Sequence, residues 1–81
     1  MEKDEFEHKW ASHGGTSGMR FLVTTIGIIQ ATNMSITEVE KMSSRGMVTK
    51  FYNVRLSQTL GEGYPVHEVA TIRLDRIKEV L

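Results

Sequence analysis

Positively charged and aromatic side chains are interleaved in one short segment of this 81-residue chain. The members of this group are Lys41, Arg45, Lys50, Phe51, Tyr52 and Arg55. Cations attract phosphates and aromatic rings stack on bases, so the mixture is typical of surfaces that hold single-stranded nucleic acid. Alternation along a strand, however, would place Phe51 and Arg55 on one face and Lys50 and Tyr52 on the other. Segment 41–55 therefore predicts a site for single-stranded RNA or DNA, with only half of its members acting together.

The other polar residues form no pattern that catalysis or metal binding requires. His8 and His13 are five residues apart, a spacing that matches no usual zinc-ligand pattern. The serines and threonines lack the strand-to-helix context of a nucleophile elbow. Gly61-Glu62-Gly63 lacks a third glycine, and its central acid would repel a phosphate. We expect a protein that is not an enzyme and that uses no metal, no cofactor and no small-molecule substrate.

Length and composition further limit the classes of protein to which this chain can belong. A chain of 81 residues forms one domain with a thin core, which a second copy would help to stabilise. Ten basic and ten acidic residues cancel, so no long-range field draws the whole molecule to nucleic acid. Cysteine is absent, which favours a cytoplasmic location. The apolar run 21–31 is too short to cross a bilayer, so no membrane partner is expected. The small size favours an accessory or regulatory protein of a bacterium or phage.

Two segments with alternating apolar residues should position the candidate site. Residues 47–56 and 66–74 are rich in β-branched side chains and flank the turn-forming stretch 61–65, which predicts an antiparallel β-ribbon. Val54 and Leu56 in the first segment, and Ala70 and Ile72 in the second, would face one shared core.

The remaining elements are predicted from helix-capping residues, loop-forming residues and composition. Residues 1–18 have an acidic opening and a glycine-rich end, which predicts a flexible tail before a single domain at 19–81. Phe6 and Trp10 would share a face if residues 4–11 formed a short helix, which would need a docking surface. Residues 20–30 predict one central strand. Residues 35–46 predict a helix, because two capping boxes precede a terminal glycine.

Two architectures fit the order strand, helix, strand, strand. We favour an α+β fold with a small antiparallel sheet of three or more strands and one short helix. The alternative is a small SH3-like or Sm-like β-barrel, because residues 72–77 are similar to the strand-to-turn closures of such barrels. In the open sheet, one short helix cannot cover apolar residues on both faces.

The uncovered side chains lead to the main functional hypothesis. We expect Met47, Phe51, Tyr52 and Val69 to meet a second copy or a protein partner, because monomers rarely expose large contiguous apolar patches. The predicted function is a non-enzymatic interaction module that self-associates or docks through its β-sheet. Nucleic-acid binding by Lys41, Arg45, Lys50 and Arg55 is the alternative.

Overall fold

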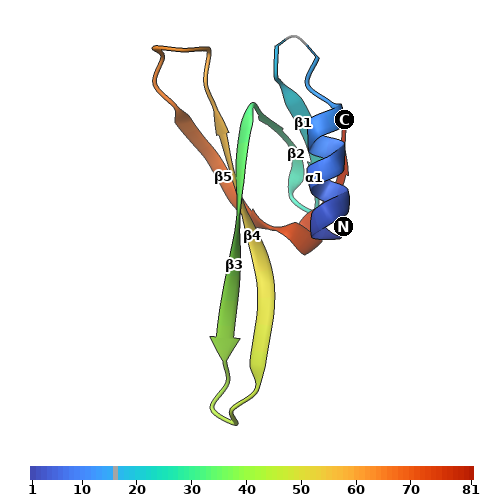
Figure 1. Cartoon of the computed structure of the whole chain (residues 1–81), viewed down its shortest axis with the longest axis vertical. Coiled ribbons are helices and arrows are strands. Elements are labelled where there is room, and N and C mark those ends of the chain that lie inside the picture. Colours follow the sequence, from blue (N-terminus) through green and yellow to red (C-terminus); the bar gives the residue numbers. More distant parts are fainter. Residues whose placement is uncertain (16) are drawn as a thin grey trace.

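The computed structural model describes residues 1–15 and 17–81 (Figure 1). The elements are α1 (Lys3–Ser12), β1 (Arg20–Thr24), β2 (Gly27–Ala31), β3 (Asn33–Met42), β4 (Val48–Gln58), β5 (His67–Arg73), the 3-10 turn η1 (Leu74–Arg76) and β6 (Ile77–Val80). The fold is a small α+β arrangement with one short helix and antiparallel strands, which confirms the predicted class.

The strands form two three-stranded sheets. Sheet A has the order β2-β1-β6 and sheet B the order β3-β4-β5. The chain passes from one sheet to the other at Thr32, whose amide donates to the Ser57 carbonyl at 2.9 Å. The sheets are not closed into a barrel, so the SH3-like or Sm-like alternative is wrong for the described residues. Sheet edges that a closed barrel would pair are left open instead.

The predicted ribbon is confirmed. Strands β4 and β5 pair antiparallel, with Val54 opposite Ile72 and Leu56 opposite Ala70. Val54, Leu56 and Ile72 are buried, as the alternation predicted. A bulge between Leu56 and Ser57 leaves Val69 as an extra residue on β5.

The helix predicted for residues 35–46 is wrong, because this segment forms β3 and continues into a turn. Its β-branched residues Ile36, Thr37 and Val39 favour a strand, and ten cross-strand pairs with β4 outweigh the capping signals. The apolar spacing was ambiguous, since Met34 and Ile36 also fit the two-residue period of a strand.

Residues 20–30 contain two strands, β1 and β2, where one central strand was predicted. Gly27 has a φ of 119°, in the left-handed region that favours glycine, and it pairs with Thr24 across a tight turn. The Thr24 hydroxyl donates to the Gly27 carbonyl at 2.7 Å and accepts from the Ile26 amide at 3.1 Å. The turn reverses the chain, which explains why apolar residues of segment 20–30 occur at both even and odd positions.

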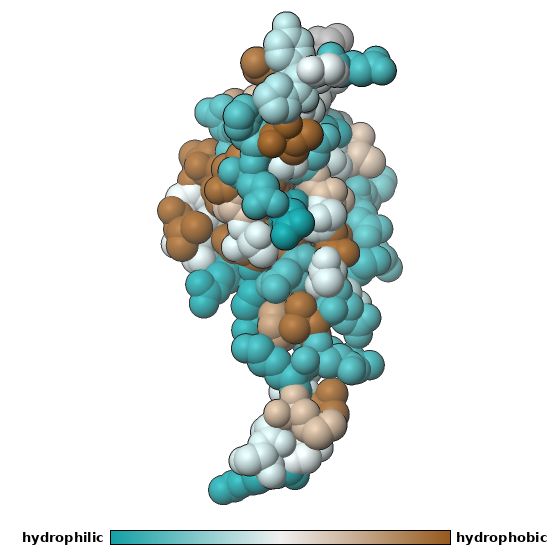
Figure 2. Space-filling model, turned by 90° about the vertical axis from the view of Figure 1, so that its left-hand side faces the viewer, coloured by the Kyte–Doolittle hydropathy of each residue, from teal (hydrophilic) through white to brown (hydrophobic). Residues whose placement is uncertain are grey.

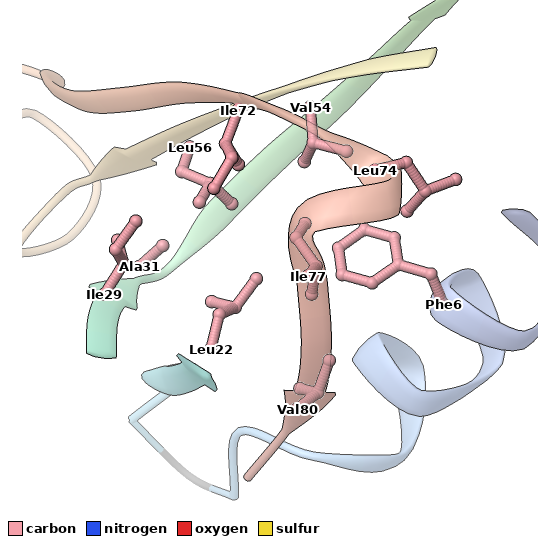
Figure 3. Close-up of a cluster of buried hydrophobic side chains, with 10 residues drawn as sticks. All are labelled: Phe6, Leu22, Ile29, Ala31, Val54, Leu56, Ile72, Leu74, Ile77 and Val80. Carbon is pink, nitrogen blue, oxygen red and sulfur yellow. The ribbon is translucent and has the colours of Figure 1, made fainter. Parts of the chain in front are cut away.

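The core lies between the sheets and is completed by α1 (Figure 3). Its ten buried residues are Phe6, Leu22, Ile29, Ala31, Val54, Leu56, Ile72, Leu74, Ile77 and Val80. The Phe6 ring projects from α1 toward Leu74 and Ile77, and its side chain is fully buried. Residues 3–12, which the sequence placed in a flexible tail, therefore contribute to the same core as residues 19–81.

Arg20 holds the end of α1 against sheet A. Its Nε donates to the Trp10 carbonyl at 3.0 Å, and its guanidinium lies 4.4 Å from the centre of the Trp10 ring. Gly14 has a φ of 109°, and a Cβ at this position would lie 2.7 Å from Cζ of Arg20. An alanine there would be strained and would push Arg20 off the tryptophan ring.

We expect Gly14→Ala to lower the free energy of unfolding by about 1–3 kcal/mol. Urea unfolding followed by Trp10 fluorescence measures this loss. Gly15→Ala is the matched control, because Gly15 has a φ of 52° but a Cβ added there would have no neighbour within 4 Å. Its cost should be about 1 kcal/mol. An equal or larger loss for Gly15→Ala would show that the Arg20 contact has no role.

The β3–β4 hairpin projects far from the core. It extends along the longest dimension of the molecule, 48 Å, and passes well beyond α1 in Figure 1. Met42, Met47 and Val48 near its tip are exposed. These side chains contribute little to the core and are available for contacts outside the chain.

Candidate interaction surfaces

The four predicted interface residues do not form one patch. Met47 lies in the turn at the hairpin tip, and Val69 lies on β5, where 41% of the side chain is exposed. Phe51 and Tyr52 are neighbours on β4 and point to opposite faces of sheet B, with Tyr52 packed against the core. We define the core face of sheet B as the side of Tyr52, and the outer face as the side of Phe51.

The predicted basic residues are also divided between the two faces. Arg55 lies on the outer face beside Ser35, Thr37, Asn53 and Thr71. Lys50 lies on the core face, where its Nζ is 3.3 Å from Glu40 and 3.8 Å from Glu38. Arg45 lies in the exposed turn between β3 and β4. The structure thus brings Lys41 and Arg55 to the face of Phe51 and separates Lys50 from them.

Arg73 joins this outer face, although the sequence pattern did not mark it as a site residue. Its guanidinium lies 4.4 Å from the centre of the Phe51 ring, and the Lys41 ammonium lies 5.5 Å from that centre. Arg73 is opposite Asn53 in the β4–β5 ladder, which places it diagonally next to Phe51. The alternation of β5 already placed Arg73 on the side away from the core, but its position next to Phe51 required the register of the two strands.

Four strands lie at the edge of a sheet among the residues that the structure describes: β2, β3, β5 and β6. Strand β3 carries Glu38 and Glu40, and charged side chains on an edge strand disfavour the addition of another strand. On β2, the Gln30 carbonyl already accepts from Nε2 of Gln58 at 2.7 Å. Strand β2 is uncharged over its whole length, and strand β5 is uncharged over residues 69–72. Because the Gln58 side chain already occupies a backbone carbonyl of β2, β5 is the described edge best suited to accept another strand.

The register shows which amides of β5 face this open edge. The Ser43 amide donates to the Met47 carbonyl at 2.8 Å, so odd-numbered residues of β4 direct their backbone groups toward β3. Even-numbered residues therefore face β5, and Val54 and Ile72 form a hydrogen-bonded pair. It follows that the backbone groups of Thr71 and Arg73 are directed away from β4.

A local ion pair restrains the edge of β6. Glu79 Oε1 accepts from Lys9 Nζ at 2.6 Å and from the Val80 amide at 3.1 Å, which ties α1 to β6. The hydrogen bond from Lys9, followed by that from the Val80 amide, holds the pKa of Glu79 below its ordinary 4.5, and nearby His13 adds to this effect. The same contact raises the pKa of Lys9 above 10.5, with Glu5 as a second acid 3.7 Å away.

We expect Glu79→Gln to destabilise the protein at about pH 7 and to have little effect at about pH 3. The folded-state pKa of Glu79 is lowered, so its contribution is present above 4.5 and is lost as the pH falls through the lower folded value. Urea unfolding of both proteins at the two pH values tests this. The same difference in unfolding midpoint at both would mean that the charge of Glu79 does not matter.

The described residues offer hollows rather than an enclosed catalytic pocket. One hollow of about 190 Å³ near the start of α1 has acidic and basic side chains mixed along its lining, including Glu2, Lys3, Arg73 and Asp75. In the part of the chain that the structure describes, no three potential metal ligands lie together. Two larger hollows share Asn53 and Thr71: one of about 250 Å³ lies on the outer face of sheet B, and one of about 360 Å³ reaches past β5 to Ile26 and Arg76.

Comparison with known proteins yields no relative: no family model matches the chain, and no curated protein or solved structure is significantly similar to it. Within residues 1–15 and 17–81, no helix has the length and apolar character needed to span a membrane. A functional proposal therefore depends on the surfaces described above.

Proposed function

We propose that this protein is a non-enzymatic interaction module that self-associates through the open edge of β5. The supporting observation is that the uncharged stretch 69–72 pairs with β4 on one side and has no strand on its other side among the described residues. An added strand would satisfy its free backbone groups, and exposed Val66 and Val69 would supply apolar contact beside it. We further propose a cytoplasmic accessory role, in keeping with the absence of cysteine.

Apolar side chains elsewhere on the surface favour association as well. Phe21, Ile26, Ile28 and Leu81 on or beside sheet A are exposed. In the face shown in Figure 2, hydrophobic groups are scattered among hydrophilic ones, with several together at its left-hand edge. A domain of this size has a thin core, and burial against a second copy would add to its stability.

Two assemblies are compatible with an open β5 edge. Two copies can pair β5 with β5 around a two-fold axis, or β5 of one copy can pair with the edge of β6 in the next. The first gives a closed dimer, and the second gives a ring or a filament.

Light scattering after size exclusion, over a series of concentrations, tests the proposal. We expect a mass that is a multiple of 9.2 kDa and that decreases on dilution. Twice this mass would indicate β5–β5 pairing, and a higher multiple would indicate pairing of β5 with β6. A 9.2 kDa particle at all concentrations would contradict self-association and leave docking to a different protein as the remaining role for this edge.

A further inference from the structure

The outer face of sheet B differs from the core face in its charge. The acidic residues of β3, Glu38 and Glu40, lie on the core face together with Lys50. The positions of β3 and β4 that point outward carry Lys41 and Arg55 and no acid. One β-hairpin thus separates an acid-containing face from a cationic one, although the chain as a whole has no net charge.

The cationic face also carries an aromatic ring at one end and polar groups along its length. Phe51 is half-buried, with the guanidinium of Arg73 4.4 Å from its ring centre. From there, Asn53 and Thr71 line two hollows of about 250 and 360 Å³ that they share. Arg55 lines the first hollow and Arg73 the second.

We propose that this outer face binds single-stranded nucleic acid. Lys41 and Arg55 contact phosphates, a base stacks on the Phe51–Arg73 pair, and Asn53 and Thr71 offer hydrogen bonds to bases or sugars. An unpaired strand can lie along this face with its bases turned toward the sheet, whereas the bases of a duplex are already paired.

The acids near this face leave the cations accessible. Glu68 lies 3.5 Å from Arg55, and Asp75 lies 2.9 Å from Arg73, but all four side chains are well exposed. Exposed ion pairs contribute at most about 1 kcal/mol, so a phosphate can compete with either carboxylate. An acidic peptide would satisfy the same cations, but it would leave the stacking surface of Phe51 unused.

The test measures fluorescence anisotropy of labelled oligouridine and oligothymidine, each about 12 nucleotides long. We expect binding at about 50 mM salt that weakens strongly by about 200 mM. Lys41→Gln and Arg55→Gln should each weaken binding about threefold or more, and Phe51→Leu about fivefold. Lys78→Gln is the matched control, because it removes the same single charge from an exposed position on β6 of the other sheet, and binding should be unchanged.

Several outcomes would overturn this assignment. They are no binding at about 50 mM salt, an equal loss for Lys78→Gln and Arg55→Gln, or equally tight binding of a duplex or of polyglutamate. Light scattering on Lys41→Gln and Arg55→Gln separates this test from that of self-association. Neither substitution lies on the β5 edge, so the mass of both variants should equal that of the wild type.

Discussion

Phe6→Ala is expected to lower the free energy of unfolding by about 3–5 kcal/mol. The Phe6 side chain is fully buried and lies among Leu74, Ile77 and Val80, so alanine would leave a cavity between α1 and both sheets. Domains of this size are stable by only about 5–15 kcal/mol, and the variant should be close to unfolding at room temperature. Urea unfolding followed by circular dichroism measures the loss.

His8→Ala is the control for Phe6→Ala, since His8 lies on the exposed side of the same helix. We expect its effect to stay within about 0.5 kcal/mol. If Phe6→Ala were equally mild, residues 1–18 would behave as the flexible tail that their composition predicted, and α1 would not belong to the folded domain.

Val69→Lys is expected to weaken self-association at least about tenfold, which corresponds to about 1.4 kcal/mol. Val69 stands at the start of the uncharged stretch of β5, and a lysine there would bring a charge into the contact between copies. The substitution should leave the fold intact, because 41% of the side chain is already exposed. Light scattering at several concentrations gives the apparent dissociation constant.

Met42→Lys provides the matched comparison, because it introduces the same charge in place of an exposed apolar side chain. Met42 is 75% exposed and lies at the end of β3, away from the β5 edge. We expect its association to equal that of the wild type. If both lysine variants dissociated to the same extent, general charge repulsion would explain the effect, and the β5 edge would lose its assigned role.

The sequence predicted the parts of the fold in which local pattern and tertiary pairing agree. Strands β4 and β5 have β-branched residues at alternating positions, and Val54 pairs with Ile72 as that alternation requires. Residues 35–46 were misassigned because caps and a terminal glycine are local signals, whereas pairing with β4 is a long-range interaction that a sequence window does not contain. For α1, the Phe6–Trp10 spacing was visible, but the core that receives Phe6 is built from residues about 70 positions away.

The candidate sites were predictable to a similar degree. The two-residue alternation of a strand was enough to separate Phe51 and Arg55 from Lys50 and Tyr52. Lys50 forms ion pairs with Glu38 and Glu40, and the incorrect helix assignment concealed these pairs. The alternation of β5 placed Arg73 on the side opposite core-facing Ile72, but its contact with Phe51 depends on the register of β4 and β5, which its own strand does not reveal.

Hydrogen exchange at the edge of β5 tests most directly whether another molecule completes that edge. The amides of Thr71 and Arg73 point away from β4 and have no strand to receive them within the described chain. At the concentration where the protein associates, we expect both amides to exchange slowly in the wild type and rapidly in Val69→Lys. Rapid exchange of Thr71 and Arg73 in the associated wild type would contradict strand addition at β5.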